Sequence, residues 1–335
     1  EGQDYALAFQ NTKCLIYDDA GALVQTLTSC PWNAAQTKEL TVAYSADTII
    51  VWHKDFAMYK ILRTGATSFT GSNFVFEIHS SGAPTYQPYY KFLAATSTIT
   101  PSATTGTGTA TCNVDLFVSG HVDTIMRYKG KEFQIDSITS PTVAVITVLE
   151  TLASTTADAD WEEQTFSAVR GFPRCGTFHD QRLYMAGSTE RPDGLWGSKV
   201  AAFFNFDVGT AIADEALDVS VATTNLQLFS NGGEIYVPQS ITGPITPENI
   251  RFIPQTPYGA SQKVNPIKFD GATLYLQRTG KVIREFVWND SEQSYTSNAV
   301  SILSNHLIND GVDSAALLGT TTTPEQYAFF VNADG

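Results

Sequence analysis

The stretch from Leu40 to Leu62 reads LTVAYSADTIIVWHKDFAMYKIL and contains three short runs of β-branched and aromatic residues. Leu40 to Tyr44 and Thr48 to Trp52 flank a Ser-Ala-Asp step, the kind of polar turn that joins two antiparallel strands. The third run, Met58 to Leu62, follows closely. This pattern predicts a β-hairpin that continues into another strand.

Runs of the same kind recur along the chain at roughly 8 to 12 residues, while helical periodicity is nearly absent. The Asp18-Asp19-Ala20-Gly21 step predicts one turn, and Asn231-Gly232-Gly233 predicts another. Further expected strands are Tyr5 to Phe9, Cys14 to Tyr17, Leu183 to Met185, Leu226 to Phe229, Glu234 to Val237, Thr273 to Gln277, Lys281 to Trp288 and Gln326 to Val331. Many short strands at this spacing are typical of sandwiches, barrels and propellers. We therefore predict a mainly β fold.

The texture of the sequence changes between about Gly71 and Arg170. Thr-rich segments, Thr96 to Thr111 and Thr151 to Asp160, enclose a compact β-rich stretch. Its expected strands are Asp115 to Val118, Phe133 to Ile138 and Val143 to Leu149. We predict a small β-barrel or sandwich domain at residues 72–168, inserted into a larger domain made of residues 1–71 and 169–335.

The charge of the chain argues against nucleic-acid or membrane binding. Its 34 acidic and 20 basic residues give a net charge of −14, and Lys and Arg form no cluster. Proteins that hold DNA are normally basic, because neutralising phosphates supplies most of the affinity. No apolar run approaches the ~18–20 residues that cross a bilayer. An acidic protein is still suited to the wall of a channel through which DNA passes without specific binding.

Cysteine and histidine residues show no spacing typical of a reactive or metal site. Cys14, Cys30, Cys112 and Cys175 lack a C-x-x-C pair and are expected to be small buried hydrophobic residues. The histidines are His53, His79, His121, His179 and His306. His179, beside Asp180 and Arg182, is the most suggestive, and we interpret it as a residue at a strand end that bonds the backbone.

Other candidate motifs also have structural interpretations. The acidic group Asp158, Asp160, Glu162 and Glu163 is expected to be a solvated linker face or a minor cation site. A sialidase Asp box is approximated by Asp193-Gly194-Leu195-Trp196, but the spacing from Asp to Gly is wrong. The better explanation is a turn at Pro192-Asp193-Gly194, with Trp196 packed below it. Gly106 and Gly108 resemble a phosphate-binding loop only superficially, because neither a Lys nor the start of a helix follows them.

Aromatic residues are numerous and are expected to fill the core. Trp32, Trp52, Trp161, Trp196 and Trp288 are interpreted as mostly core residues. Phe203, Phe204 and Phe206 are so close in sequence that some are expected to face different sides, one of them a contact with a neighbouring subunit. We assign no catalytic, cofactor-binding or metal residue and expect the chain not to be an enzyme.

Four segments resemble the tail nozzle proteins of short-tailed bacteriophages, also called tail tubular protein B or stabilisation proteins. Leu40 to Thr70 is similar to an early pattern of that family. Val169 to Asp207 (VRGFPRCGTFHDQRLYMAGSTERPDGLWGSKVAAFFNFD) is similar to its Gly-aromatic-Pro, Phe-His-x-x-Arg-Leu, Pro-Asp-x-Leu-Trp-Gly-Ser and Phe-Phe-Asn-Phe elements, in order. Gly243 to Phe252 with Tyr258-Gly259, and Leu276 to Glu285, continue the match. The middle region resembles the small FCCH-like β-domain of such proteins.

The resemblance implies a β-propeller-containing subunit of a hexameric ring in the virion tail, assembled in the host cytoplasm. Such a ring binds the tail adaptor, extends the tail tube, retains the genome and conducts DNA during ejection; tail fibres are a further possible partner. Two departures stand out. Val221 to Leu226 is shorter than the family pattern, and the sequence stops at Asp334-Gly335, so the C-terminal part is expected to be incomplete.

Two other functions remain open from the sequence. The inserted domain, with its Thr-rich segments, would suit docking to a host surface or to a tail fibre. A glycan hydrolase associated with the tail would need two carboxylates that face each other across a cleft.

Overall fold

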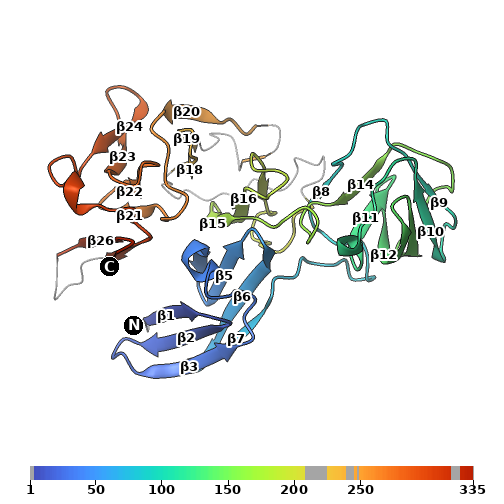
Figure 1. The fold of residues 1–335 in the computed structure, drawn as a ribbon, viewed down its shortest axis with the longest axis horizontal. Helices are drawn as coiled ribbons and strands as arrows, with labels where there is room; N and C mark the ends of the chain where they lie inside the picture. Colours follow the sequence, from blue (N-terminus) through green and yellow to red (C-terminus); the bar gives the residue numbers. More distant parts are fainter. Residues whose placement is uncertain (1–3, 208–224, 239–244, 247–248, 318–324, 335) are drawn as a thin grey trace. The chain divides into compact units, whose positions relative to one another are not determined.

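The computed structural model describes residues 4–207, 225–238, 245–246, 249–317 and 325–334. These residues form seven antiparallel sheets and three short 3₁₀ helices, and no α-helix occurs among them (Figure 1). The prediction of a mainly β fold is confirmed. The chain divides into two compact units, Glu1–Asp214 and Glu215–Gly335, called unit 1 and unit 2 below.

Unit 1 begins with two small sheets, in the orders β1-β2-β3 and β4-β5-β6-β7. Their strands are β1 (Tyr5–Gln10), β2 (Lys13–Asp18), β3 (Leu23–Thr28), β4 (Thr41–Ser45), β5 (Thr48–His53), β6 (Phe56–Gly65) and β7 (Ser68–Asn73). The hairpin predicted at residues 40–52 is confirmed, since β4 and β5 pair from Thr41 opposite Trp52 to Ser45 opposite Thr48. The predicted turn at residues 18–21 is present too, closed by the Gly21 N–H on the Asp18 carbonyl at 3.0 Å.

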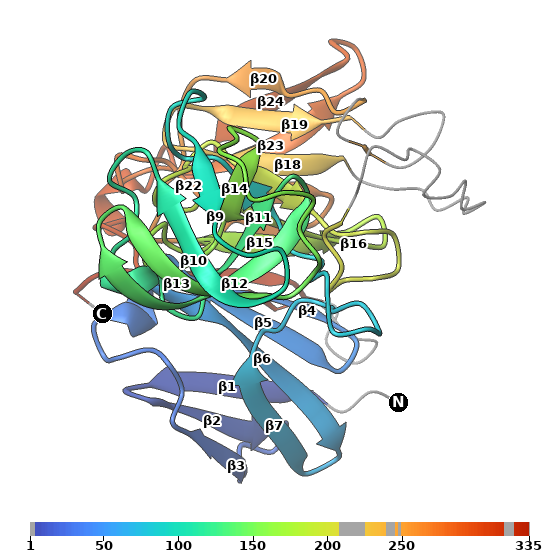
Figure 2. The same cartoon turned by 90° about the vertical axis from the view of Figure 1, so that its right-hand side faces the viewer.

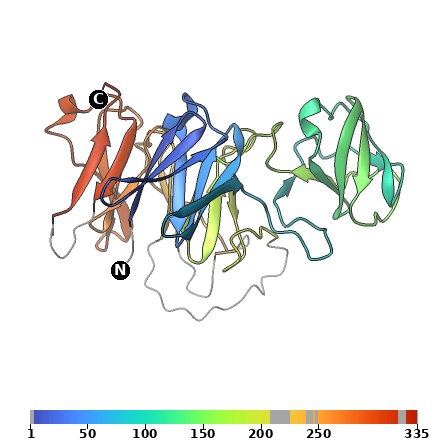
Figure 3. The ribbon, with the colours of Figure 1, turned by 90° about the horizontal axis from the view of Figure 1, so that it is seen from below.

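These two sheets lie side by side and share a core (Figure 3, blue strands). The Gln25 side chain links them, because its amide nitrogen donates to the Phe69 carbonyl at 2.8 Å and its oxygen accepts the Phe69 N–H at 2.6 Å. Trp32 is fully buried between them and meets Phe9 and Tyr59 edge to face, each at 5.4 Å between ring centroids. Aromatic packing therefore joins strands that are distant in sequence.

Residues 89–164 of unit 1 form a seven-stranded sheet, which we call the insert sheet (Figure 2, green). Its order is β8-β14-β11-β12-β13-β10-β9. The strands are β8 (Tyr89–Tyr90), β9 (Ile99–Pro101), β10 (Gly106–Cys112), β11 (Ile125–Tyr128), β12 (Lys131–Ser140), β13 (Val143–Val148) and β14 (Trp161–Gln164). A bridge between Ile99 and Asp158 joins β9 to the segment before β14 without closing the sheet into a barrel.

The insert sheet has a hydrophobic core of its own, which includes Tyr128, Phe133 and Trp161. One strand predicted here is wrong: Asp115 to Val118 is a loop. Leu116 and Phe117 are both buried, and both donate their N–H to the Pro141 carbonyl at 2.8 Å. Two consecutive inward side chains break the alternation that a strand requires.

The last sheet of unit 1 has the order β15-β16-β17, formed by Cys175–His179, Arg182–Ala186 and Leu195–Gly197. Asp180 and Gln181 connect its first two strands with φ of 47° and 57°, the left-handed pair of a two-residue hairpin turn. Leu183 and Met185 pack in one core with Ile50 and Trp52 of β5. The sequence segments before and after the insert sheet therefore meet in space.

Unit 2 contains three further sheets, in the orders β18-β19-β20, β21-β22-β23-β24 and β25-β26. Their strands are β18 (Leu226–Phe229), β19 (Glu234–Val237), β20 (Ile253–Thr256), β21 (Ile267–Phe269), β22 (Ala272–Leu276), β23 (Ile283–Asn289), β24 (Ser294–Ala299), β25 (Asp313–Leu317) and β26 (Tyr327–Val331). The core centres on Tyr275 and on Phe286, which stacks on Tyr295 at 4.6 Å between centroids.

The 3₁₀ helices are η1 (Gln36–Glu39), η2 (Ser119–His121) and η3 (Asn305–Leu307). No helix among the described residues is long and apolar enough to cross a membrane. The segment Val221 to Leu226 was expected to be shorter than the family pattern. Its residues 221–224 lie outside the described residues.

Candidate functional site

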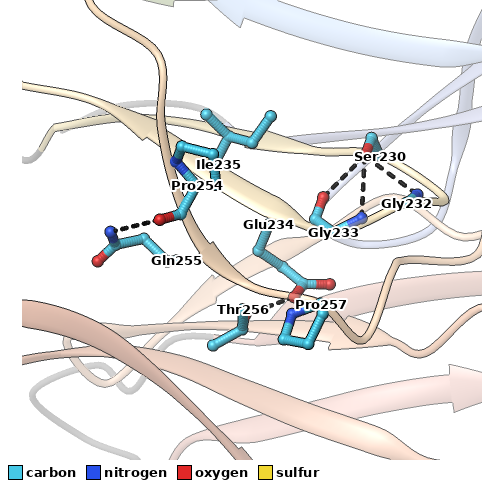
Figure 4. Close-up of a pocket in the computed structure, with 9 residues that line it drawn as sticks. All are labelled: Ser230, Gly232, Gly233, Glu234, Ile235, Pro254, Gln255, Thr256 and Pro257. Carbon is cyan, nitrogen blue, oxygen red and sulfur yellow. Dashed lines mark hydrogen bonds between the residues drawn. The ribbon is translucent and has the colours of Figure 1, made fainter.

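Unit 2 has a pocket of about 300 Å³ at the turn between β18 and β19 (Figure 4). It is lined by Ser230, Gly232, Gly233, Glu234, Ile235, Pro254, Gln255, Thr256 and Pro257. The Ser230 hydroxyl shapes the turn, because it accepts the N–H groups of Gly232 and Gly233 at 3.2 and 3.1 Å. Glu234 supplies the one ionisable side chain of this lining.

Glu234 is fully buried because β19 alternates, which places it on the same inward side as Tyr236. Its Oε2 accepts a hydrogen bond from the Thr256 hydroxyl at 2.5 Å, whereas Oε1 has no hydrogen-bond partner among the described residues. Burial, and to a smaller extent the nearness of Glu234, raises the pKa of the Tyr275 hydroxyl. A hydrolase of the glycosidase type uses two carboxyl groups, and this lining provides one.

Two other buried carboxylates lie where the chain enters and leaves the insert sheet of unit 1. The first is Glu132, which is fully buried on β12. Its Oε1 and Oε2 accept the Thr85 N–H at 2.9 and 2.8 Å, and Oε1 accepts the Tyr89 hydroxyl at 2.6 Å. The Arg127 guanidinium lies 3.5 Å from Oε1 and 3.8 Å from the Tyr89 ring centroid. Glu132 thereby fixes the segment that leads into β8.

The second buried carboxylate, Glu163 on β14, is 2% exposed. Its two oxygens accept Arg170 Nε and Nη2 at 3.0 and 2.7 Å, a bidentate pair that holds the segment leaving the insert sheet. His121 Nε2 lies 3.1 Å from Glu163 Oε2, and His121 Nδ1 accepts the Val118 N–H at 3.1 Å. Because Nδ1 is an acceptor, the proton of the neutral ring is on Nε2 and points at the carboxylate.

The expectation of a solvated acidic face at residues 158–163 is therefore wrong for Glu163. Alternation along β14 turns Trp161 and Glu163 inward, and Arg170 and His121 compensate the buried charge. Asp158 does lie at the surface, where it pairs with Lys129 at 2.6 Å. Among the described residues, no group of three or more His, Cys, Asp or Glu is placed to hold a metal ion.

The remaining histidines are scattered. His53 is buried, stacks on Phe56 and accepts the Asp55 N–H on Nδ1 at 3.2 Å. His79 Nδ1 lies 2.7 Å from the Ser81 hydroxyl in an exposed loop. His179 ends β15 opposite Arg182, as expected of a residue at a strand end. His306 lies exposed in η3.

Cys14, Cys30 and Cys112 are buried as predicted, whereas Cys175 at the start of β15 is exposed, contrary to expectation. Burial raises the pKa of the Cys14 thiol to about 12 and, to a smaller extent, that of Cys30. These two thiols are therefore protonated at neutral pH and are poor nucleophiles.

The other sequence motifs have structural roles. Residues 191–194 form a turn closed by the Gly194 N–H on the Arg191 carbonyl, and a Cβ on Gly194 would lie 2.2 Å from the Trp196 ring. Gly106 and Gly108 belong to β10. Phe206 is buried in a core against which Phe203 and Phe204 pack. The three rings contact different partners, because Phe203 meets Phe178, Phe204 meets Phe74 and Phe206 meets Phe76.

Sequence reasoning missed Glu132 and Glu234 as buried acids. The signal was present for Glu234, because strand alternation puts it in line with the inward Tyr236. No comparable signal marks Glu132, whose closest hydrogen-bond donors, Tyr89 and Thr85, lie 43 and 47 residues away in the sequence. A scan of protein-family models finds none that matches the chain, and no curated protein matches it.

Proposed function

We propose that this chain is a structural subunit of a virus particle, a component of the tail nozzle ring of a short-tailed bacteriophage. The observation that carries the proposal is the succession of up-and-down antiparallel meanders of three or four strands. The orders β4-β5-β6-β7 and β21-β22-β23-β24 have the size and connectivity of a propeller blade, and β15-β16-β17 and β18-β19-β20 lack one strand of that pattern. The sequence resemblance implies the same architecture.

The buried ionisable groups support a role without chemistry. Glu132 and Glu163 are each engaged by hydrogen bonds that fasten neighbouring segments, and Glu234 bonds Thr256. The networks around Glu132 and Glu163, in which both carboxylate oxygens are bonded, rigidify a scaffold, whereas a catalytic acid or base must reach its substrate.

The net charge of −14 fits a conduit. In a ring of such subunits, acidic and neutral polar side chains would face the channel, and like charge would keep the passing DNA from adhering. In this proposal the ring is a hexamer that binds the tail adaptor and works by its shape.

Negative-stain electron microscopy of the purified full-length protein tests the proposal. Rings with a central channel are the expected result, together with an acidic lumen in a cryo-EM reconstruction. A protein that stays monomeric at high concentration, or that digests capsule or peptidoglycan in dilute solution, would overturn it.

A docking role for the insert sheet is a second candidate, favoured by exposed valines on one of its loops. Val114, Val118 and Val122 are 43%, 52% and 37% exposed around η2. Particles whose subunits lack residues 72–168 should then form rings but adsorb poorly. Unchanged adsorption would exclude this role.

A further inference from the structure

The pocket of unit 2 has exposed edges and one buried residue. Of the residues that line it, Glu234 alone is buried, whereas Gly232, Pro254 and Pro257 are exposed. The Glu234 carboxylate lies between the turn that contains Gly233 and Pro257 (Figure 4). A molecule that enters between the exposed residues therefore approaches this carboxylate.

One oxygen of the Glu234 carboxylate is unused. Oε2 accepts the Thr256 hydroxyl at 2.5 Å, whereas Oε1 has no hydrogen-bond partner among the described residues. The Tyr275 hydroxyl is near Glu234 but bonds the Ser297 hydroxyl at 2.7 Å. A buried carboxylate oxygen without a donor is unfavourable, so a ligand that supplies a donor gains free energy here.

The other polar side chains of the lining are fully engaged. The Ser230 hydroxyl donates to the Gly233 carbonyl at 2.8 Å and accepts two backbone N–H groups of the same turn. Gln255 accepts the Tyr295 N–H on Oε1 at 2.6 Å and donates from Nε2 to a backbone carbonyl at 3.0 Å. In the part of the chain that the structure describes, Glu234 Oε1 is thus the one polar side-chain atom of the lining that has no partner.

The two buried carboxylates of unit 1 show what Glu234 lacks. Glu132 lies 3.5 Å from the Arg127 guanidinium, and Glu163 lies 2.7 Å from that of Arg170. Glu234 forms no ion pair with any described residue. A buried carboxylate is normally paired with a positive charge, so a bound cation would complete this site.

The shape of the pocket indicates the kind of cation. A single free oxygen suits one N–H donor of an ammonium group better than the paired donors of a guanidinium. Ile235, Pro254 and Pro257 provide apolar surface beside it. The volume of about 300 Å³ far exceeds the ~30 Å³ share of a water molecule, so there is room for an aliphatic stem.

We propose that this pocket binds a primary ammonium group on an aliphatic stem. The ammonium donates to Glu234 Oε1, and the stem lies against Ile235 and the two prolines. The inference goes beyond the proposed function and does not depend on ring assembly. Two sources share this chemistry, a free alkylamine and the lysine side chain of a partner protein.

Three probes with the same four-carbon stem test the inference on the full wild-type chain. They are n-butylammonium, butyltrimethylammonium, which has the charge without N–H donors, and n-butanol, which lacks the charge. In NMR titrations at constant ionic strength, n-butylammonium should shift the amide signals of Gly232 and Gly233 and bind at least about tenfold more tightly than the other two. Equal binding of all three probes, or no shift at up to about 100 mM n-butylammonium, would overturn the inference.

A variant pair links the binding to the carboxylate. Glu234→Gln should weaken n-butylammonium binding at least about tenfold, whereas Glu292→Gln, at an exposed acid of unit 2, should bind like the wild type. The melting temperature of Glu234→Gln should be unchanged or raised, because no cationic partner within the described chain loses its counter-ion. Wild-type binding by Glu234→Gln would overturn the inference. If this variant does not fold, the comparison of the three probes on the wild type decides.

The two sources are distinguished by their affinities. Putrescine represents a free amine, and Nα-acetyl-lysine methylamide represents a lysine side chain in a protein. Tighter binding of putrescine would assign a free amine, and tighter binding of the lysine derivative would assign a protein partner; both results uphold the ammonium site. Failure of all ammonium probes refutes the site whether or not electron microscopy shows rings, so the proposed function is tested separately.

Discussion

Glu163 and Arg170 form a bidentate ion pair, with Arg170 Nε and Nη2 at 3.0 and 2.7 Å from the two carboxylate oxygens, at the point where the chain leaves the insert sheet. The carboxylate is 2% exposed and the guanidinium side chain 14%. A pair so deeply buried is costly to break, because each partner would be left as an uncompensated charge.

Glu163→Gln should therefore lower the free energy of unfolding by about 2 to 4 kcal/mol, since Arg170 loses its counter-ion. Urea unfolding monitored by fluorescence measures this. The control is Glu162→Gln, at the neighbouring, less buried position of β14, which should change stability by less than about 0.5 kcal/mol. Equal effects of the two variants would contradict the structural role of the pair.

Tyr89→Phe removes the hydroxyl that donates to Glu132 at 2.6 Å. We expect a loss of about 1 to 2 kcal/mol, because a buried charged acceptor loses one of its donors. Tyr90→Phe, at the adjacent exposed ring, should be close to neutral. Thermal unfolding of the two variants side by side makes the comparison, and a neutral Tyr89→Phe would show that Thr85 and Arg127 suffice for Glu132.

His53 should make unit 1 less stable at mildly acidic pH. Burial lowers the pKa of His53, outweighing the opposing influence of Asp55 and Glu39. A base with a lowered pKa in the folded state takes up protons more readily when unfolded, so stability falls as pH drops through the ordinary His value of about 6.5. Protonation also abolishes the acceptor that Nδ1 offers to the Asp55 N–H.

The stability difference between the wild type and His53→Gln should therefore shift in favour of the variant between pH 7 and pH 5. Unfolding curves at several pH values measure it, with His79→Gln, at an exposed loop, as control. A difference that stays constant over this range would contradict the prediction.

Gly176→Ala probes the contact between β15 and β5. A Cβ at this position would lie 2.5 Å from the Trp52 ring and 2.6 Å from the Tyr184 carbonyl oxygen. Overpacking of this kind costs about 1 to 3 kcal/mol. Gly232→Ala is the control, since its nearest neighbour would be the Ser230 hydroxyl at 3.7 Å. A melting temperature unchanged by Gly176→Ala would show that β15 can move away from Trp52.

Strand positions in this protein were predictable because they depend on local patterns. The runs at residues 226–229 and 234–237 coincide with β18 and β19, and the Ser-Ala-Asp step at residues 45–47 is a hairpin turn. Each of these follows from alternation and turn chemistry within about ten residues of sequence. Prediction failed for residues 115–118, where apolar residues continue without alternation into a loop.

The sequence by itself determined that this chain forms short antiparallel strands and carries a strong negative charge. Only the tertiary structure decided which polar groups are buried and what compensates them, as for Glu132 with Thr85 and Glu163 with His121. The physical reason is the distance along the sequence over which the two kinds of interaction act. Backbone pairing follows from neighbouring residues, whereas the cost of burying a charge is set by partners that the fold brings from tens of residues away.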